Sequence, residues 1–282
     1  MTVVVKIGGA KAVDPEGALA DVAALVNAGE SVVVVHGGST AVDDALERLD
    51  IEPDYVETPS GVVGRFTDAE TMDVFKMVFG RLNTDIVARL QSMAVDAVGL
   101  SGVDGGLLRG SRKSAIRVLE DGKRKIRRGD HSGTIAAVND ELLELLLDAG
   151  YTPVATVPML ADDGTPVNSD ADRAAAAIAG ELGATLVELT DVPGVFADPD
   201  DPETLINAVE TPEEFAALVD AAEGFMGRKV MAAEEALAAG ATRVVVADAN
   251  ADEPIRSALD GAGTTVHPGA VSADADAEEA AK

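Results

Sequence analysis

Runs of β-branched residues without polar alternation recur along this chain and alternate with amphipathic segments. Thr2–Ile7 is such a run and residues 31–35 are a second, so each predicts a strand buried on both faces of a parallel sheet. Further strands are predicted at residues 96–100, 151–157, 185–189, 243–247 and 264–267. Apolar residues at helical spacing predict helices at 16–29, 40–49, 68–91, 135–149, 211–221 and 224–239, with an alanine-rich helix ending at Leu182. This alternation predicts βαβ units and an α/β fold around a mostly parallel sheet, whose ligands bind beyond the carboxyl ends of the strands.

The first two predicted strands both end in glycine pairs. Lys6 precedes Gly8 and Gly9, and the second strand is followed by Gly37 and Gly38 near the start of a helix. A lysine in a buried strand is costly unless it meets an anion, while glycines and a helix start present free backbone N–H groups. One such turn alone is equally compatible with a tight loop whose lysine reaches water. Two in close succession favour an anion-binding edge, although the chain has neither a Walker A loop nor a Gly-x-Gly-x-x-Gly fingerprint.

Two side chains near these turns have alternative interpretations. His36, at the end of the second strand, is either a general base or a structural histidine bonded to the backbone, and we favour the structural role. Arg65, just before the helix predicted at 68–91, either holds a carboxylate or is an ordinary surface arginine. Apolar residues cover much of that helix, which predicts burial on two sides, as a core helix or as a subunit interface.

Residues 109–128 form a basic segment in an otherwise acidic chain. They hold nine of the 22 basic residues, against only Glu120 and Asp121. The Glu120-Asp121-Gly122 triplet lies between short β-type runs and predicts a hairpin. A basic hairpin in such a chain implies an acidic or phosphate-bearing partner rather than only a solvated face.

Polar residues gather again at helix starts in the second half of the chain. Asn168, Asp170 and Asp172 precede or open the alanine-rich helix, and N-capping accounts for only one of the three. Asp172 then remains either to bind Mg2+ or to orient lysines. Lys229, one of only eight lysines, lies beside glycines at another helix start. The strand at 185–189 leads into a turn containing Asp191, which would lie beside a flat ring if one bound there.

Composition narrows the class of protein. The chain has 282 residues, 47% apolar and 3% aromatic, enough for one large α/β domain or two lobes around a core of valine, leucine, isoleucine and alanine. The absence of cysteine excludes disulfides and thiolate chemistry. No apolar stretch is long enough to span a membrane and no leader pattern precedes the first strand, so a cytoplasmic location is expected.

The charge balance is strongly acidic. A formal net charge of −28 argues against nucleic acids and anionic membranes as partners. A lysine-poor acidic surface is typical of a cytoplasm with molar salt, where screening weakens self-repulsion, so a halophilic source is expected; an acidic mesophilic enzyme is the alternative. Residues 270–282 are acidic and alanine-rich, and they are predicted to form a disordered tail.

Five motifs, in order, resemble those of the amino acid kinase family. They are Val-Lys-Ile-Gly-Gly at 5–9, His-Gly-Gly at 36–38, Asn-Ser-Asp-Ala-Asp at 168–172, Thr-Asp-Val-Pro-Gly-Val at 190–195 and Gly-Phe-Met-Gly-Arg-Lys at 224–229. The N-acetylglutamate kinase branch is the most similar. Arg65-Phe66-Thr67-Asp68 and the basic motifs at 112–117 and 128–133 look more specifically like the carrier-protein-dependent kinases. Those kinases phosphorylate glutamate or 2-aminoadipate attached to the acidic amino-group carrier protein LysW.

The resemblance implies a three-layer αβα sandwich, with an acceptor-binding lobe at 1–160 and a nucleotide-binding lobe at 161–269. It implies ATP-dependent phosphorylation of a side-chain carboxylate, with Mg2+ carried on the ATP phosphates and no resident metal. Lys6 and Lys229 would bridge the phosphates, and Asp172 would hold both lysines. The other implied contacts are Gly37, Gly38, Arg65 and Asn168 for the acceptor, Gly8, Gly9, Asp191, Val192, Gly194 and Val195 for the nucleotide, and Arg112, Lys113, Arg117, Lys123, Arg124, Lys125, Arg127 and Arg128 for the carrier protein.

One residue departs from the family pattern, and two other functions are alternatives to a carrier-dependent kinase. Ser39 stands where the family often has a third glycine, which leaves open whether residue 39 contacts phosphate. An N-acetylglutamate kinase acting on the free small molecule gives no reason for the basic segment. A non-catalytic nucleotide-binding regulator does not need Lys6, Asp172 and Lys229 together. The family and the long helix favour a homodimer. Glutamate and aminoadipate differ by one methylene, and both remain possible acceptors.

Overall fold

The computed structural model describes residues 1–8, 15–59, 63–120, 123–222 and 224–271. The strands are β1 Thr2–Ile7, β2 Ser31–His36, β3 Tyr55–Glu57, β4 Val63–Arg65, β5 Ala97–Gly102, β6 Leu108–Glu120, β7 Lys123–Val138, β8 Thr152–Ala161, β9 Pro166–Val167, β10 Thr185–Thr190, β11 Ala208–Val209, β12 Arg243–Asp248 and β13 Thr264–Val266. The helices are α1 Pro15–Asn27, α2 Ser39–Arg48, α3 Ala69–Ser92, α4 Asp140–Asp148, α5 Ala171–Glu181, α6 Pro212–Ala221, α7 Phe225–Ala238 and α8 Pro254–Leu259. Gly9, the turn residues Asp121 and Gly122, and the predicted tail from residue 272 onward lie outside the described residues.

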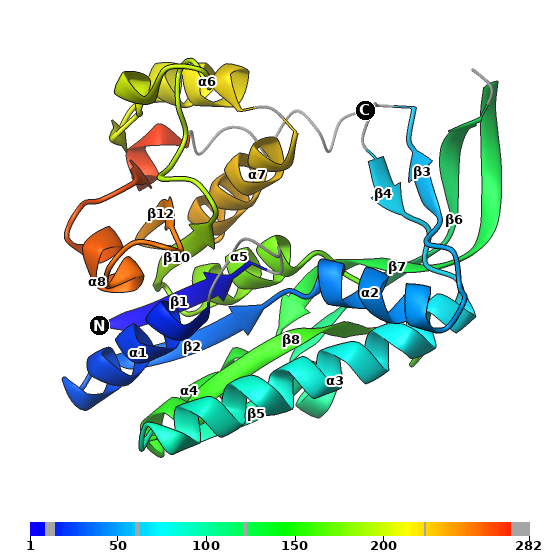
Figure 1. Ribbon diagram of the computed structural model, residues 1–282, viewed down its shortest axis with the longest axis horizontal. Coiled ribbons are helices and arrows are strands. Elements are labelled where there is room, and N and C mark those ends of the chain that lie inside the picture. Colours follow the sequence, from blue (N-terminus) through cyan, green and yellow to red (C-terminus); the bar gives the residue numbers. More distant parts are fainter. Residues whose placement is uncertain (9–14, 60–62, 121–122, 223, 272–282) are drawn as a thin grey trace.

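The first strand lies in the middle of the main sheet, whose order is β11-β13-β12-β10-β1-β2-β8-β6-β7 (Figure 1). β1 pairs in parallel with β2 on one side and with β10 on the other. Strands β10 to β13 therefore lie on one side of β1, and β2 and β5 to β9 lie on the other. The predicted boundary between lobes falls at the end of β8, and both halves share one continuous sheet. The prediction of an α/β fold with a mostly parallel sheet is confirmed, with antiparallel pairing at β6–β7, β8–β9 and β12–β13.

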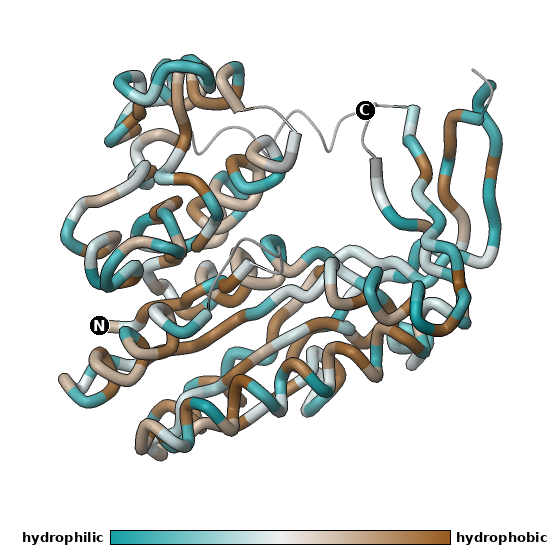
Figure 2. Tube along the Cα trace, viewed as in Figure 1, coloured by the Kyte–Doolittle hydropathy of each residue, from teal (hydrophilic) through white to brown (hydrophobic). Residues whose placement is uncertain are grey.

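Alternating side chains of β1 supply both faces of the sheet. Val3, Val5 and Ile7 belong to a buried cluster with residues of α1 and α8. Val4 belongs to the cluster on the opposite face, where α5 and α7 pack. Lys6, two residues after Val4, points to that same face because strand side chains alternate. Figure 2 shows the hydrophobic residues concentrated in the central strands and hydrophilic stretches along the β6–β7 hairpin.

The predicted long helix is confirmed as α3, which begins one residue after its cap. The Asp68 carboxylate accepts a hydrogen bond from Thr71 N at 2.8 Å, as an N-cap residue should. Phe75 and Phe79 in its first half join the cluster on the α5 face, and Leu90 near its end joins the cluster of α1. The helix therefore packs against both clusters. Whether it is also a subunit interface stays a prediction.

The helix predicted at 135–149 is wrong in its first part. Residues 135–138 continue β7, and α4 begins only at Asp140. Ile135 pairs with Gly110 and Val138 with Leu108, so the backbone groups of this apolar stretch are satisfied by strand β6. The side chain of Asn139 caps α4 by accepting from Leu142 N at 3.3 Å. Within the described ranges, no helix has the length and apolar character needed to span a membrane.

Candidate active site

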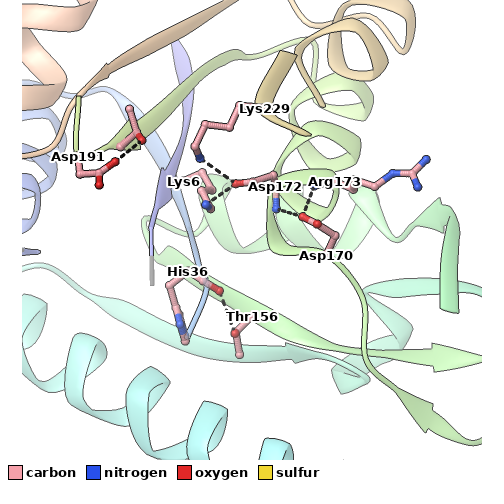
Figure 3. A network of polar contacts seen from close by, with 9 residues as sticks. Lys6, His36, Thr156, Asp170, Asp172, Arg173, Asp191 and Lys229 are labelled. Atoms are coloured by element: carbon pink, nitrogen blue, oxygen red, sulfur yellow. Dashed lines mark hydrogen bonds and ion pairs between the residues drawn. The ribbon is translucent and has the colours of Figure 1, made fainter. Parts of the chain in front are cut away.

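Three residues that are distant in the sequence meet at the carboxyl end of β1. Lys6 comes from β1, Asp172 from the first turn of α5 and Lys229 from the first turns of α7. Lys6 forms an ion pair with Asp172, and Lys229 Nζ lies 3.4 Å from the same carboxylate oxygen (Figure 3). The side chains of Lys6 and Lys229 are only 7% and 10% exposed, so this is a buried pair of cations held by one carboxylate.

The electrostatics of this group favour the charged forms of Asp172 and Lys229. Burial alone would raise the pKa of Asp172, but the ammonium groups of Lys6 and Lys229 outweigh it and hold that pKa below its usual value. Burial alone would lower the pKa of Lys229, but the carboxylates of Glu188 and Asp172 outweigh it and raise that pKa. Two close, fixed ammonium groups form a receptor for an anion with several negative oxygens, such as a polyphosphate.

The polar trio at the start of α5 divides into separate roles. Asp170 is the N-cap, and its carboxylate accepts from Asp172 N at 2.8 Å and from Arg173 N at 3.4 Å. This bond fixes the backbone of Asp172, which leaves the Asp172 carboxylate free to face the lysines. The side-chain amide of Asn168 lies 3.5 Å from Thr67 Oγ1, and its backbone N donates to His131 O at 2.7 Å. Asn168 therefore connects the start of α3 to β7.

Gly37 and Gly38 lie where β2 passes into α2. The N–H of Gly37 donates to Ile7 O at 3.2 Å and continues the β1–β2 pairing, so in this structure it is not the free donor that the sequence predicted. A Cβ at Gly38 would lie 2.6 Å from Leu82 Cδ1 and 3.0 Å from Phe79 Cε1, so a larger residue would have to displace side chains of α3. Gly38 is also the N-cap of α2 and has no capping side chain.

His36 makes contacts typical of a structural histidine. Its ring is buried, Nδ1 lies 2.9 Å from Gly37 O and Nε2 lies 3.3 Å from Asn83 Nδ2. Thr156 Oγ1 also donates to the carbonyl of His36 at 3.1 Å (Figure 3). Burial lowers the pKa of His36 to about 4, only partly offset by the bond to Gly37, so the ring is neutral at pH 7.

Arg65 on β4 is held by a polar group rather than exposed on the surface. Its Nη2 lies 2.5 Å from Asp43 Oδ1 on α2 and 2.9 Å from the hydroxyl of Tyr55. The guanidinium carbon lies 5.2 Å from the centroid of the Phe75 ring, and the side chain is 7% exposed. Its Nε atom is buried and has no hydrogen-bond partner among the described residues. This geometry fixes the guanidinium through Nη2 and leaves the Nε–H as a donor without a partner among the described residues.

The residues predicted for the nucleoside follow β10. Asp191 accepts from Thr190 Oγ1 at 3.2 Å and lies apart from the group of Lys6, Asp172 and Lys229 (Figure 3). Val195 is buried, and its N–H donates to Thr264 Oγ1 at 2.8 Å. A Cβ at Gly194 would lie 2.6 Å from that same hydroxyl, so β13 closely packs the turn. Within the described part of the chain, no hydrogen bond or ion pair joins Val192 or Gly8 to the lysine pair, and Gly9 lies outside the described residues.

Glu188 is a site residue that the sequence analysis missed. It lies on β10 as the register partner of Lys6, and its side chain is fully buried. Neighbouring residues in parallel strands point to the same face, so Glu188 lies beside Lys6 on the α5 face. The only signal in the sequence is one acidic residue within the apolar run 185–189.

The basic residues of the β6–β7 hairpin fall on two faces. The inner face packs Val118 against Val56 and Phe66, beside strands β3 and β4. Arg127 belongs to this face: it pairs with Asp54 and stacks 4.0 Å from the centroid of the Phe66 ring. Lys125 on the same face lies 2.8 Å from Glu120.

The other face of the hairpin presents arginines to solvent. Arg117 pairs with Ile126, Leu119 with Arg124, and Ala115 with Arg128, and directly opposed residues of antiparallel strands share a face. We call Arg117, Arg124, Arg128 and Ile126 the arginine face. All four side chains are exposed, Ile126 by 68%. Arg112, by contrast, is tied to Asp130 O and His131 Nε2 at 3.2 and 3.1 Å, and the exposed Lys113 lies nearer the sheet.

Comparison with known proteins identifies the family. The profile described as "Amino acid kinase family" matches residues 1–248. The [LysW]-aminoadipate kinase of Deinococcus radiodurans is 44% identical over 266 residues, which cover 94% of this chain and 91% of that protein. The [LysW]-aminoadipate kinase of Thermus thermophilus is 43% identical over 271 residues, covering 94% and 99%. The acetylglutamate kinase of Methanopyrus kandleri is 44% identical over 238 residues, covering 83% and 90%.

Solved structures support the fold. N-acetylglutamate synthase from Neisseria gonorrhoeae, complexed with coenzyme A and N-acetyl-glutamate, superimposes with a TM-score of 0.76 at 25% identity. The match covers 94% of this chain but 59% of that longer one. Carbamate kinase from Giardia lamblia bound to AMP-PNP matches with a TM-score of 0.65 at 16% identity, covering 94% and 98%.

Proposed function

This chain belongs to the amino acid kinase family, and on that premise we propose that it transfers the γ-phosphoryl group of ATP to the side-chain carboxylate of aminoadipate or glutamate carried on LysW. The observation that carries the proposal is the pair of buried ammonium groups, Lys6 and Lys229, held by the one carboxylate of Asp172. The names of two relatives that are 43–44% identical over most of the chain support LysW as the carrier.

The chemistry needs alignment and charge neutralisation more than it needs a base. An oxygen of the acceptor carboxylate attacks the γ-phosphorus, the bond from that phosphorus to the bridging oxygen of ADP breaks, and the products are an acyl phosphate and ADP. A carboxylate is already a nucleophile, so no proton has to be removed. Lys6 neutralises charge on the acceptor side of the transferred group and Lys229 on the leaving-group side, as developing charge requires. His36, buried and neutral, takes no part.

Mg2+ belongs to the nucleotide in this mechanism. The carboxylate of Asp172 already contacts two ammonium groups, so it orients lysines and is not placed as a metal ligand. Oxygen-rich phosphates are the ligands that Mg2+ usually takes in kinases. The turn that holds Asp191, Val192, Gly194 and Val195 is proposed to line the nucleoside pocket, with Gly8 and Gly9 beside the phosphates.

The acceptor is proposed to bind where α2, β4 and the start of α5 converge. Arg65 offers its unpartnered Nε edge to the acceptor's free carboxylate, beside Gly37, Gly38 and Asn168. The Asp43 carboxylate holds Nη2 of Arg65, so the guanidinium is fixed before the substrate arrives.

The carrier protein is proposed to dock on the arginine face of the hairpin. Three exposed arginines around an exposed isoleucine offer both positive charge and an apolar contact to an acidic partner. Arg112, Arg127 and Lys125 already have partners within the chain, so they contribute to the hairpin's own structure. Lys113 and Lys123 are exposed beside the arginine face and add to its positive field.

The test is acyl-phosphate formation, trapped with hydroxylamine in high KCl. Three acceptors are compared: LysW bearing aminoadipate, LysW bearing glutamate, and free N-acetylglutamate. We expect turnover on a carrier-bound acceptor, and the faster carrier identifies the acceptor amino acid. The acetylglutamate kinase relative makes free N-acetylglutamate the second candidate. Preference for that small molecule would leave the kinase chemistry in place and overturn the carrier assignment.

We propose three further properties. The acidic, lysine-poor surface suits a cytoplasm with molar salt, with the net charge of −28 screened by counterions. The exposed side of α3, where Met77 is 60% exposed, is the proposed homodimer contact. Residues 1–160 are proposed to supply most of the acceptor site and residues 161–269 most of the nucleotide site. The exceptions are Asn168 at the acceptor, Gly8 and Gly9 at the phosphates, and Lys6, which serves both.

A further inference from the structure

Glu188 is a buried carboxyl group for which the phosphotransfer chemistry above has no use. Its side chain is 0% exposed, and neither carboxylate oxygen has a hydrogen-bond partner among the described residues. Leaving a buried carboxylate unpaired costs several kcal/mol, so such a residue needs a reason to be there. The position is one strand away from Lys6, in direct register with it.

Charged groups face Glu188 from every element packed on its side of the sheet except β12. β1 contributes Lys6, the start of α5 contributes Asp170 and Asp172, and α7 contributes Lys229. β12 is the other strand that neighbours β10, and its register partner for Glu188 is the apolar Val246. The carboxylate of Asp170 accepts from backbone N–H groups at the start of α5. The two ammonium groups are therefore left with two carboxyl groups, Glu188 and Asp172, and Asp172 is already committed to both lysines.

The charge on Glu188 decides how attractive the lysine pair is to an anion. With Asp172 ionised and Glu188 protonated, the group of four side chains carries a net charge of +1; with both ionised, it carries none. Burial, and after it the Asp172 carboxylate, raise the pKa of Glu188, Lys229 and Lys6 lower it, and the net result is a pKa of about 8. At neutral pH the protonated form therefore predominates, and it leaves the lysines free to bind phosphate.

We propose that Glu188 is a positioning residue that sets the charge of the phosphate-binding lysines and is protonated whenever nucleotide phosphates occupy them. Binding a polyanion next to Glu188 disfavours its ionised form, so wherever the free protein has lost this proton the carboxylate takes up one proton from solvent as the nucleotide binds. This inference rests on the proposed function, because it assumes that Lys6 and Lys229 bind the nucleotide phosphates.

The sign of the pH dependence follows from this linkage. Below about pH 8, Glu188 is protonated in both the free and the bound protein, and nucleotide affinity does not depend on it. Above that pH the free protein loses the proton and the complex keeps it, so affinity falls by up to about tenfold per pH unit. The nucleotide phosphates titrate near pH 6, so they remain fully ionised across this range.

The experiment is calorimetric binding of MgADP at pH 8.5–9, in two buffers with different heats of ionisation. The wild-type protein is compared with Glu188→Gln, which removes the titration, and with Glu181→Gln, an exposed residue of α5 as a control. We expect uptake that approaches about one proton per nucleotide in the wild type and in Glu181→Gln, and almost none in Glu188→Gln. The KM for ATP should rise with pH in the wild type and stay nearly flat in Glu188→Gln, while kcat changes little.

Three outcomes separate the claims. Equal proton uptake by the wild type and Glu188→Gln would overturn the role of Glu188 while leaving nucleotide binding intact. Failure of the wild-type protein to bind MgADP at any pH would instead overturn the proposed function. If Glu188→Gln does not fold, the infrared difference spectrum of the wild type decides: MgADP binding at pH 9 must increase the protonated-carboxyl band, and an unchanged band refutes the inference.

Discussion

The molecule has two groups of cations that differ in burial, and the difference indicates their roles. Lys6 and Lys229 are 7% and 10% exposed and share the carboxylate of Asp172, whereas Arg117, Arg124 and Arg128 are exposed on the hairpin and have no ion-pair partner among the described residues. Buried charges interact strongly because little water screens them. Removing the counter-ion of a buried charge therefore strongly destabilises the folded protein. Exposed charges act over a longer range and weaken with salt. The buried pair therefore suits chemistry, and the exposed group suits recognition of a partner.

The largest expected effect is on the buried side. Lys229→Ala should lower turnover by about 10²–10³ or more, because it removes a fixed charge that stabilises the leaving group. Much of the nucleotide affinity should remain, since Lys6 and the turn after β10 are untouched. Hydroxylamine trapping measures the first quantity and MgADP calorimetry the second.

The control is Lys76→Ala, which removes an exposed lysine paired with Asp73 on α3. It should leave both quantities unchanged. An equal loss of turnover and of nucleotide affinity in Lys229→Ala would contradict the assignment of Lys229 to the leaving group.

The next largest effect is on stability. Asp172→Asn leaves two buried ammonium groups without their counter-ion and should lower the free energy of unfolding by about 3–5 kcal/mol. The pKa of Asp172 is lowered in the folded protein: burial opposes this, but Lys6 and Lys229 outweigh it. Its stabilising contribution is therefore present at neutral pH and lost as the pH falls through that lowered pKa. Denaturant unfolding at several pH values measures both effects.

Asp170→Asn is the matched control, because asparagine caps a helix about as well as aspartate and keeps the bond to Asp172 N. It should cost a small fraction of the loss in Asp172→Asn. Similar losses in the two variants would mean that helix capping, rather than the ion group, stabilises this region.

A smaller effect is expected on the exposed side. Replacing Arg117, Arg124 and Arg128 with glutamate should raise the KM for the carrier-bound acceptor by roughly 10- to 100-fold, because the docking face then repels an acidic partner. Free N-acetylglutamate, if it is used at all, should be unaffected. The difference should shrink as KCl is raised, since exposed charges are screened. Steady-state kinetics over a range of KCl concentrations provides the measurement.

Lys125→Glu changes the charge of a lysine on the inner face of the same hairpin, which is paired with Glu120, and serves as the control. It should raise that KM far less than the arginine-face variant does. A larger effect from the inner face would refute the docking assignment, even if the chain proves to use LysW.

The sequence predicted those features of the molecule that have a recognisable local pattern of residues. Lys6 and Lys229 both lie next to glycines at the end of a strand or the start of a helix, and the family motifs connect them across more than two hundred residues. The α/β fold followed from the apolar runs, and α3 was predicted to within one or two residues of its ends.

The parts that the sequence could not predict depend on pairing between strands. In the sequence, Glu188 is only one acidic residue in an apolar run. The register of β10 with β1 is what places it beside Lys6. Residues 135–138 are compatible with either helix or strand, and only pairing with β6 decides between them. The division of the hairpin cations into two faces likewise follows from register, since nine basic residues in one segment do not show which of them have internal partners.

The smallest expected effect is a loss of stability at Asp68, a carboxylate that is mostly exposed and can be compared with the buried Asp172. Asp68→Ala removes the cap of α3 and should cost about 1 kcal/mol of stability, well below the cost of Asp172→Asn. The bond from Thr71 N, more than the nearby charges of His131 and Arg127, holds the pKa of Asp68 below its usual value. Its contribution is therefore present at neutral pH and disappears as the pH falls through that lowered pKa, so the Asp68→Ala and wild-type unfolding curves should converge in acid. A loss as large as that of Asp172→Asn would show that burial is not what separates the two carboxylates.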